Sequence, residues 1–363
     1  MSEIRQNTEK CEKTDQSVSD VRFAAVNSGR GFYSFYTPIF DRENIRRRYI
    51  IKGGPGTGKS RFMNTVAARA EAKGMLVEYY RCSSDPDSLD GIIVDGRMAM
   101  MDGTAPHTVE PQVVGARDEI INLGEFWDGE LLSDSYNDIV SLGILKANCY
   151  KKAYRFLAAA LEVDGINRSL SLPAVRREKM QGAAERLCRT LPNGNGYELR
   201  PFALSSIGMK GRVRLDTVEK KAKQLYWIDD HFGTGCLFLN ALIEIGRNKN
   251  CALRVSYCPL DPDLPDGVCF EESEVCFLLA DTTDSDAVGR INMKRFLDRD
   301  KIGRIRAEYR MNERLREALI DSAQEALAES GRYHFALEQI YSSCMNFDAL
   351  TLFTQSFCDA IFQ

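Results

Sequence analysis

The feature that most constrains the fold of this 363-residue chain is an internal repeat. Three blocks of sequence return in the same order, displaced by 177, 176 and 179 residues. The paired blocks are 49–58 with 226–235, 80–91 with 256–267, and the strand ending at Asp102 with 276–281. Blocks that keep one order at nearly constant spacing indicate a duplicated structural unit, so the sequence predicts two similar domains.

The first copy contains a glycine-rich segment, GGPGTGKS, which matches G-x-x-x-x-G-K-[ST] at every required position. Its glycines allow the backbone to curl so that successive N–H groups converge on phosphate oxygens. Lys59 is expected to reach the β- and γ-phosphates, and Ser60 is expected to supply a hydroxyl to Mg²⁺. The residues expected to bind ATP are Gly53, Gly54, Pro55, Gly56, Thr57, Gly58, Lys59, Ser60 and Arg61.

The sequence on either side of this loop has the character that the motif requires. Residues 49–51 are apolar and β-prone, and residues 61–73 are rich in helix formers with apolar side chains at helical spacing. A further strand is expected over 75–80, and a hairpin over 22–40. The predicted fold class is α/β, with two tandem P-loop NTPase-like domains built on mainly parallel sheets, each followed by a helical extension.

A carboxylate for the metal ion is expected at Asp102. The apolar run that starts at Met98 ends in this aspartate, a pattern in which the carboxylate holds Mg²⁺ directly or through water. Gly103 follows it, so the adjacent general-base glutamate of many ATP-driven motors is missing. Thr104 and His107 are candidates for sensing phosphate or orienting a nucleophile, although a solvent-facing turn explains His107 equally well.

A polar loop after the strand at 75–80 holds three carboxylates, Asp85, Asp87 and Asp90. Because ligands in doubly wound α/β folds bind beyond the carboxyl ends of strands, this loop is expected to face the phosphate site. Asp85 and Asp87 are therefore candidate catalytic residues beside Lys59 and Asp102, since a carboxylate there can orient water or accept a hydroxyl proton. The alternative is an ordinary acidic turn.

The second copy has lost the residues of the phosphate chemistry, because Cys236 and Leu237 replace the lysine and the serine. Asp230 and His231 replace the first two glycines, and a carboxylate at that place repels a triphosphate. The predicted layout is a mobile tail over 1–20, an active domain with its helical extension over 21–195, and a degenerate copy with its own extension over 196–363. Four arginines near the end of the first extension form either a lid over the phosphates or the solvated face of a helix; they are Arg176, Arg177, Arg186 and Arg189.

Composition limits the other function classes. A net charge of −4 and a pI near 5.7 argue against non-specific nucleic-acid binding. No apolar stretch approaches 18 residues and the N-terminus is polar, so no membrane segment is expected and the expected location is the cytoplasm. The eleven cysteines never form C-x-x-C, and neither a disulfide framework nor a zinc site is expected.

Four segments, IIKGGPGTGKS, CSSDPDSLDG, MDGTAPH and INLGEFWD, occur together with the duplication. In this combination the chain resembles a bacterial family of tandem P-loop ATP-binding proteins that are ATPases or nucleotide-kinase-like, and the resemblance covers nearly all of the chain beyond residue 20. It implies ATP binding at residues 53–60 and Mg²⁺ at Ser60 and Asp102, and it implies no substrate. In that family the second copy often keeps its own phosphate loop, from which residues 230–237 depart.

Three functions follow as expectations. The first is Mg²⁺-dependent ATP hydrolysis coupled to a conformational change, with a regulatory or structural second domain. The second is a small-molecule or nucleotide kinase with the Asp85–Asp87 loop at the acceptor site, and the third is a nucleotide-gated binding protein. A kinase needs a pocket beside Asp85 for its acceptor, whereas a switch needs that space filled by protein. The expected partners are a nucleotide and an unidentified acceptor or protein.

Overall fold

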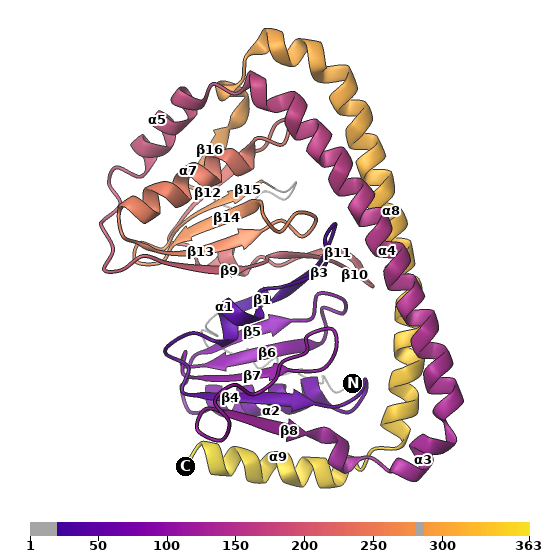
Figure 1. Cartoon of the computed structure of the whole chain (residues 1–363). Helices are drawn as coiled ribbons and strands as arrows, with labels where there is room; N and C mark the ends of the chain where they lie inside the picture. Colours follow the sequence, from indigo (N-terminus) through magenta and orange to yellow (C-terminus); the bar gives the residue numbers. More distant parts are fainter. Residues whose placement is uncertain (1–19, 281–286) are drawn as a thin grey trace, which may run out of the picture.

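The structure is a computed structural model that describes residues 20–280 and 287–363. The first half of the sequence, to residue 195, and the second half, from residue 196, each contain a six-stranded sheet with helices against it (Figure 1). The tail expected over 1–20 lies outside the described residues except for Asp20, which begins β1. Asp281, the counterpart of Asp102 in the repeat, also lies outside them.

The first sheet has the strand order β1-β5-β6-β7-β4-β8. Its strands are β1 (Asp20–Phe23), β4 (Arg47–Lys52), β5 (Val77–Arg81), β6 (Leu89–Val94), β7 (Met98–Asp102) and β8 (Asp118–Asn122). All run in one direction except β6, which pairs antiparallel with β5 and β7. The sheet is therefore mixed, because the tight turn at Asp95 and Gly96 joins β6 to β7 as a hairpin and leaves no chain for a crossover.

The second sheet has the order β16-β12-β15-β14-β13-β9, which is the order of the first sheet read from β8 to β1. Its strands are β9 (Glu198–Phe202), β12 (Gln224–Asp229), β13 (Ala252–Tyr257), β14 (Pro265–Phe270), β15 (Val275–Leu279) and β16 (Gly289–Asn292). Here β14 takes the antiparallel place of β6. The repeat in the sequence is therefore also a repeat of strand order and direction.

A two-stranded hairpin in each half lies where the halves meet (Figure 1). The hairpins are β2 (Ala25–Ser28) with β3 (Gly31–Ser34), and β10 (Ser205–Gly208) with β11 (Gly211–Arg214). The amide of Asn27 donates to the carbonyl oxygen of Ile207 at 2.8 Å, which joins one hairpin to the other. Main-chain hydrogen bonds between Phe23 and Ala203, at 2.9 and 3.0 Å, join the edges of the two sheets. The short helices α1 (Tyr36–Phe40) and α6 (Thr217–Lys221) follow the hairpins.

The helical extensions are exchanged between the halves. Helix α4 (Tyr136–Ser171) crosses from the first half to the second, where α5 (Arg177–Leu187) packs on α7 (Gly235–Asn248). Helix α8 (Arg299–Ser343) runs back along α4, and α9 (Phe347–Ile361) packs on α2 (Lys59–Glu71) (Figure 1). Shorter pieces complete the crossings, namely η1 (Leu123–Phe126), α3 (Gly129–Asp134), η2 (Leu172–Ala174) and η3 (Met293–Phe296).

Because of this exchange, each hydrophobic core is completed by the other half. Leu350 and Phe362 join the core around Phe62, whereas Met180 and Ala184 join the core of the second sheet. The linker near residue 195 separates the two repeats in sequence, but side chains from each side of it pack into the core of the other half. The four arginines on and beside α5 lie with the second half, away from the phosphate loop, so their interpretation as a lid over the phosphates is wrong.

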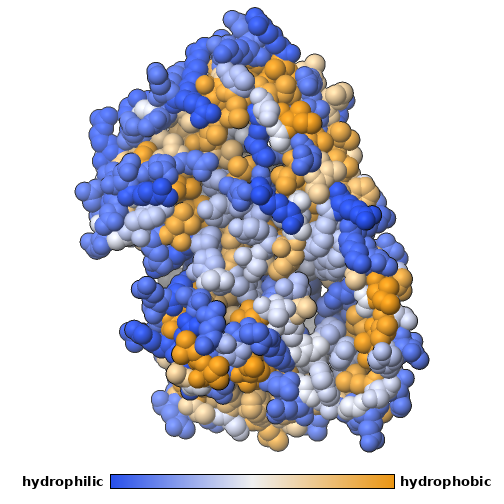
Figure 2. Space-filling view, viewed as in Figure 1, coloured by the Kyte–Doolittle hydropathy of each residue, from blue (hydrophilic) through white to orange (hydrophobic). Residues whose placement is uncertain are grey.

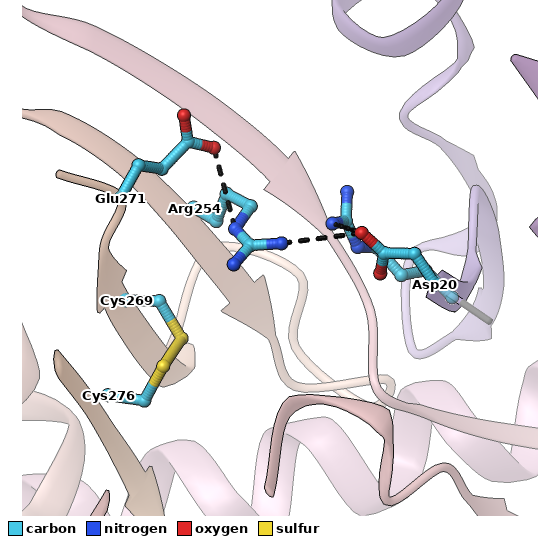
Figure 3. The surroundings of a disulfide bond; sticks show 6 residues. Asp20, Arg254, Cys269, Glu271 and Cys276 are labelled. Atoms are coloured by element: carbon cyan, nitrogen blue, oxygen red, sulfur yellow. Dashed lines mark hydrogen bonds and ion pairs between the residues drawn. A yellow bond between two sulfur atoms is a disulfide. The ribbon is translucent and has the colours of Figure 1, made fainter. Parts of the chain in front are cut away.

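One pair of cysteines departs from expectation. Cys269 and Cys276 form a disulfide (Figure 3), with their Cα atoms 4.1 Å apart. They lie directly opposite each other on β14 and β15, a register that a search for C-x-x-C spacing does not detect.

Among the described residues, no helix is both long and apolar enough to cross a lipid bilayer. The cytoplasmic location stays a prediction.

Candidate functional site

The glycine-rich segment forms a tight loop between β4 and α2, where the sequence places it. Gly56 and Gly58 have φ angles of 70° and 89°, in the left-handed region that favours glycine. A Cβ atom at Gly53 would lie 2.7 Å from Oγ1 of Thr57. That hydroxyl donates to the carbonyl oxygen of Gly54 at 2.9 Å, which holds the loop closed on itself. The curled backbone therefore depends on glycine at these positions.

Lys59 and Asp102 meet at the carboxyl ends of the parallel strands of the first sheet. The Nζ atom of Lys59 lies 3.6 Å from Oδ2 of Asp102, and it also donates to the carbonyl oxygens of Gly53 and Gly54 at 2.9 and 2.8 Å. Asp102 ends β7, which pairs parallel with β4 and places Asp102 opposite Ile51, just before the loop. The structure therefore brings together the lysine and the aspartate that the sequence selected.

Hydrogen bonds fix the orientation of Asp102 and Ser60 beside the loop. Thr104 donates its N–H and its hydroxyl to Oδ1 of Asp102, at 2.8 and 2.5 Å, so that Oδ2 faces Lys59. The hydroxyl of Ser60 accepts the N–H of Leu89 at 2.9 Å. No group of three or more His, Cys, Asp or Glu side chains in the described part of the chain is arranged to hold a metal ion. A cation at Ser60 and Asp102 would need water and phosphate oxygens as further ligands, as Mg²⁺ prefers.

Asp90 and His107 form a buried ion pair in the same region. The Nε2 atom of His107 lies 3.2 Å from Oδ2 of Asp90. The imidazole stacks on Tyr36, with ring centroids 4.5 Å apart. Burial alone lowers the pKa of His107, but Asp90, and Asp102 at longer range, raise it above its usual value. The interpretation of His107 as part of a solvent-facing turn is therefore wrong, because only 8% of the residue is exposed.

Asp85 and Asp87 follow the carboxyl end of β5, on the same side of the sheet as the loop, but they form ion pairs with a residue of the second half. Lys210, in the turn between β10 and β11, lies 2.8 Å from Oδ1 of Asp85 and also contacts Asp87. The main-chain N–H of Met209 donates to the carbonyl oxygen of Ser84 at 2.8 Å. Asp85 and Asp87 therefore bind Lys210 of the second half, whereas Asp102 faces Lys59 of the loop.

Helices α4 and α8 bring to the loop residues that the sequence did not single out. A Cβ atom at Gly56 would lie 2.6 Å from the carbonyl oxygen of Glu338 in α8. Lys146 of α4 lies 3.1 Å from Nδ1 of His334. Burial lowers the pKa of Lys146, and Lys59 adds to this effect against the opposite influence of Cys82 and Glu338. A second ammonium group therefore lies within electrostatic reach of Lys59.

In the second half, the carboxylate of Asp230 occupies the corresponding loop. Oδ1 of Asp230 accepts the N–H groups of Thr234 and Gly235 at 2.9 and 2.7 Å. The repeat aligns these two residues with Thr57 and Gly58 of the first loop. Burial raises the pKa of Asp230 despite these hydrogen bonds. The carboxylate takes donors that a phosphate would need.

No protein-family model, curated protein or solved structure matches this chain. What the site can do therefore follows from its own residues. For an anion, the site has the N–H groups of a glycine-rich loop and the ammonium group of Lys59. For a cation, it has the hydroxyl of Ser60 and the carboxylate of Asp102. These are the groups that a nucleoside triphosphate with Mg²⁺ requires.

Proposed function

We propose that the first half is a P-loop NTPase-like domain that binds ATP with Mg²⁺ at residues 53–60 and hydrolyses it. The observation that carries the proposal is the 3.6 Å approach of Lys59, at the start of α2, to Asp102, at the end of β7, beside a loop that requires glycine. Ser60 and Asp102 would hold Mg²⁺, which neutralises phosphate charge when bound. The loop N–H groups and Lys59 would bind the phosphates and stabilise the charge that develops on them.

The attacking water needs a group that orients it, and no glutamate follows Asp102. Of the three carboxylates expected to act there, Asp85 and Asp87 are engaged by Lys210. Asp90 is not engaged by Lys210, and its Oδ2 lies 3.2 Å from Nε2 of His107. We therefore assign the water-orienting role first to Asp90, with Asp85 and Asp87 as the alternatives.

Hydrolysis is favoured over phosphotransfer by what lies beside Asp85. The hairpin of the second half covers the acidic loop, so closely that a Cβ atom at Gly208 would lie 2.5 Å from the carbonyl oxygen of Ser83. An acceptor beside Asp85 would have to displace Lys210. The contacts of this hairpin and of α8 with the first half provide a route by which the state of the nucleotide acts on the second half.

The test is release of phosphate from ATP by the full-length protein, with and without a pool of small metabolites. Lys59→Ala should lower turnover at least about a hundredfold, because the ammonium acts on the transferring phosphate. Lys220→Ala, at an exposed lysine of the second half, is the control and should keep wild-type turnover. Hydrolysis at the wild-type rate by Lys59→Ala protein contradicts the proposal. ATP consumption only with the metabolite pool identifies a kinase, and binding without turnover identifies a nucleotide-gated protein.

A further inference from the structure

A cavity of about 90 Å³ lies beside the phosphate loop, between α2 of the first half and α9 of the second. It begins at Gly58, the residue before Lys59, and follows α2 as far as Thr65. Because an α-helix rises by about 1.5 Å per residue, this stretch is about 10 Å long. The cavity is therefore within reach of a group that is attached to phosphates at the loop.

Helix α9 closes the end of the cavity next to the loop. A Cβ atom at Gly58 would lie 3.1 Å from Cδ2 of Leu350 and 3.7 Å from Cε1 of Phe347. Figure 2 shows hydrophobic and hydrophilic residues side by side along the lower edge of the molecule, where Figure 1 places α9. One wall of a cavity in the first half is therefore supplied by the C-terminal helix of the second half.

The cavity has an apolar floor and a polar rim. Phe62 on its floor is buried, and Phe347 beside it is half-buried. Arg61, Thr351 and Gln355 are exposed at the rim. Apolar walls with a few polar groups are typical of pockets for small organic ligands. A nucleobase has the matching pattern, because its faces stack on aromatic rings and guanidinium groups while its edge forms hydrogen bonds.

The polar groups of the cavity differ in what they already bind. The hydroxyls of Thr351 and Thr354 donate to main-chain carbonyl oxygens one helical turn earlier, at 2.7 Å each. The side chains of Arg61 and Gln355, in contrast, form no hydrogen bond or ion pair with other residues in the described ranges. A primary amide has both donors and an acceptor, so Gln355 can recognise the polar edge of a base.

We propose that this cavity holds the base of the nucleotide whose phosphates bind at the loop, with the ring against Phe347 and Arg61 and the polar edge beside Gln355. The inference rests on the proposed ATP binding and adds the residues that recognise the nucleoside. Pockets that enclose a whole small ligand have volumes of about 300–1,000 Å³, so only the base enters here and the ribose stays at the open rim. The helix that selects the nucleotide thus belongs to the opposite half of the sequence.

The test is calorimetric titration of the full-length protein, in buffer with Mg²⁺, with a non-hydrolysable ATP analogue and, separately, with tripolyphosphate, which has three linked phosphates and no nucleoside. We expect the analogue to bind at least about tenfold more tightly, because only the analogue has a base to stack in the cavity. Thr351→Trp places an indole ring at the rim and fills the cavity. It should weaken binding of the analogue at least about tenfold and leave binding of tripolyphosphate unchanged.

The matched control is Ser356→Trp, because Ser356 is exposed on the same helix and lies outside the cavity. It should leave both affinities unchanged. Gln355→Ala removes only the group assigned to the edge of the base, at an exposed position. It should change the ratio of the affinities for ATP and GTP analogues at least about threefold.

The results separate this proposal from the proposed function. The proposal is overturned if the ATP analogue binds no more tightly than tripolyphosphate, or if Thr351→Trp leaves its affinity unchanged or weakens both ligands equally. Where Thr351→Trp protein does not fold, an unchanged ratio of affinities in Gln355→Ala protein overturns it. Failure of the wild-type protein to bind either ligand contradicts the proposed function itself, and this inference with it.

Discussion

Glu338, in the second half of the sequence, lies with its main chain against Gly56 of the phosphate loop in the first half. A Cβ atom on this glycine would stand 2.6 Å from the carbonyl oxygen of Glu338. The contact exists because α8 runs back along α4 and ends beside the opposite sheet (Figure 1). The candidate site is therefore assembled from both halves, although only the first half carries the phosphate motif.

Lys146 should contribute to turnover. It is a partly buried lysine of α4 within electrostatic reach of Lys59, so its ammonium can add to the charge that stabilises the transferring phosphate. We expect Lys146→Met to lower kcat about ten- to a hundredfold and to change the Kd for ATP little. Lys151→Met is the control, since Lys151 lies exposed on the same helix. Equal kcat values for the Lys146 and Lys151 variants would show that Lys146 is structural.

The three carboxylates near the loop should differ in their effect. We expect Asp90→Asn to lower kcat most, because Asp90 is buried beside His107 and not held by Lys210. Asp85→Asn and Asp87→Asn should have smaller effects, since these residues bind Lys210. Steady-state phosphate release and ATP binding are measured for each variant. Normal turnover by all three would mean that the acidic loop only maintains the fold.

The exchange of helices predicts that residues near the C-terminus stabilise the first half. Leu350 of α9 is 5% exposed and belongs to the core around Phe62. Leu350→Ala should lower the free energy of unfolding by about 3 kcal/mol, as expected for a truncated core leucine. Leu352→Ala, on the same helix but 66% exposed, should change it by no more than about 0.5 kcal/mol. Denaturant unfolding measures both, and equal effects would contradict the packing of α9 on α2.

The pKa values of two histidines should lie on opposite sides of the usual value near 6.5. Asp90 raises the pKa of His107 despite burial, whereas burial and then Lys294 lower the pKa of His231. NMR titration of the imidazole signals, assigned with His107→Gln and His231→Gln, measures both. A pKa for His107 at or below that of His231 would contradict the buried pair with Asp90.

The raised pKa of His107 also predicts how the free energy of unfolding depends on pH. Because the folded pKa of His107 is raised, its protonated form stabilises the native state fully below pH 6.5. This stabilisation is lost as the pH rises through the folded pKa. The difference in free energy of unfolding between the wild type and His107→Gln should therefore shrink as the pH increases from 6 upward. A difference that grows over this range would contradict the assignment.

Local patterns in the sequence were enough to predict the loop, its strand and helix, the strand ending at Asp102 and the duplication. Each of these depends on residues close in sequence, such as the glycines at 56 and 58 with positive φ. The place of His107 was left open because nothing nearby in sequence shows that Asp90 and Tyr36 bury it. The antiparallel direction of β6 depends on the tight turn at Asp95 and Gly96.

The contacts that the sequence did not predict join residues far apart in the chain. Lys146 and His334 are 188 positions apart, and Lys210 and Asp87 are 123 positions apart. Both contacts depend on which sheet each helix and hairpin reaches, and amphipathic spacing within one helix does not specify its partner. Residue periodicity could indicate that α5 and α9 are packed helices, but not that each covers the opposite half.

The central claim, one nucleotide bound at the first loop, is tested most directly by calorimetric titration of the full-length protein with a non-hydrolysable ATP analogue and Mg²⁺. The backbone donors of the second loop are taken by Asp230, and Cys236 and Leu237 replace the lysine and serine. We expect a stoichiometry near one, and loss of most of the binding in Lys59→Ala protein. A stoichiometry near two, or a site of similar affinity that survives Lys59→Ala, would contradict the account.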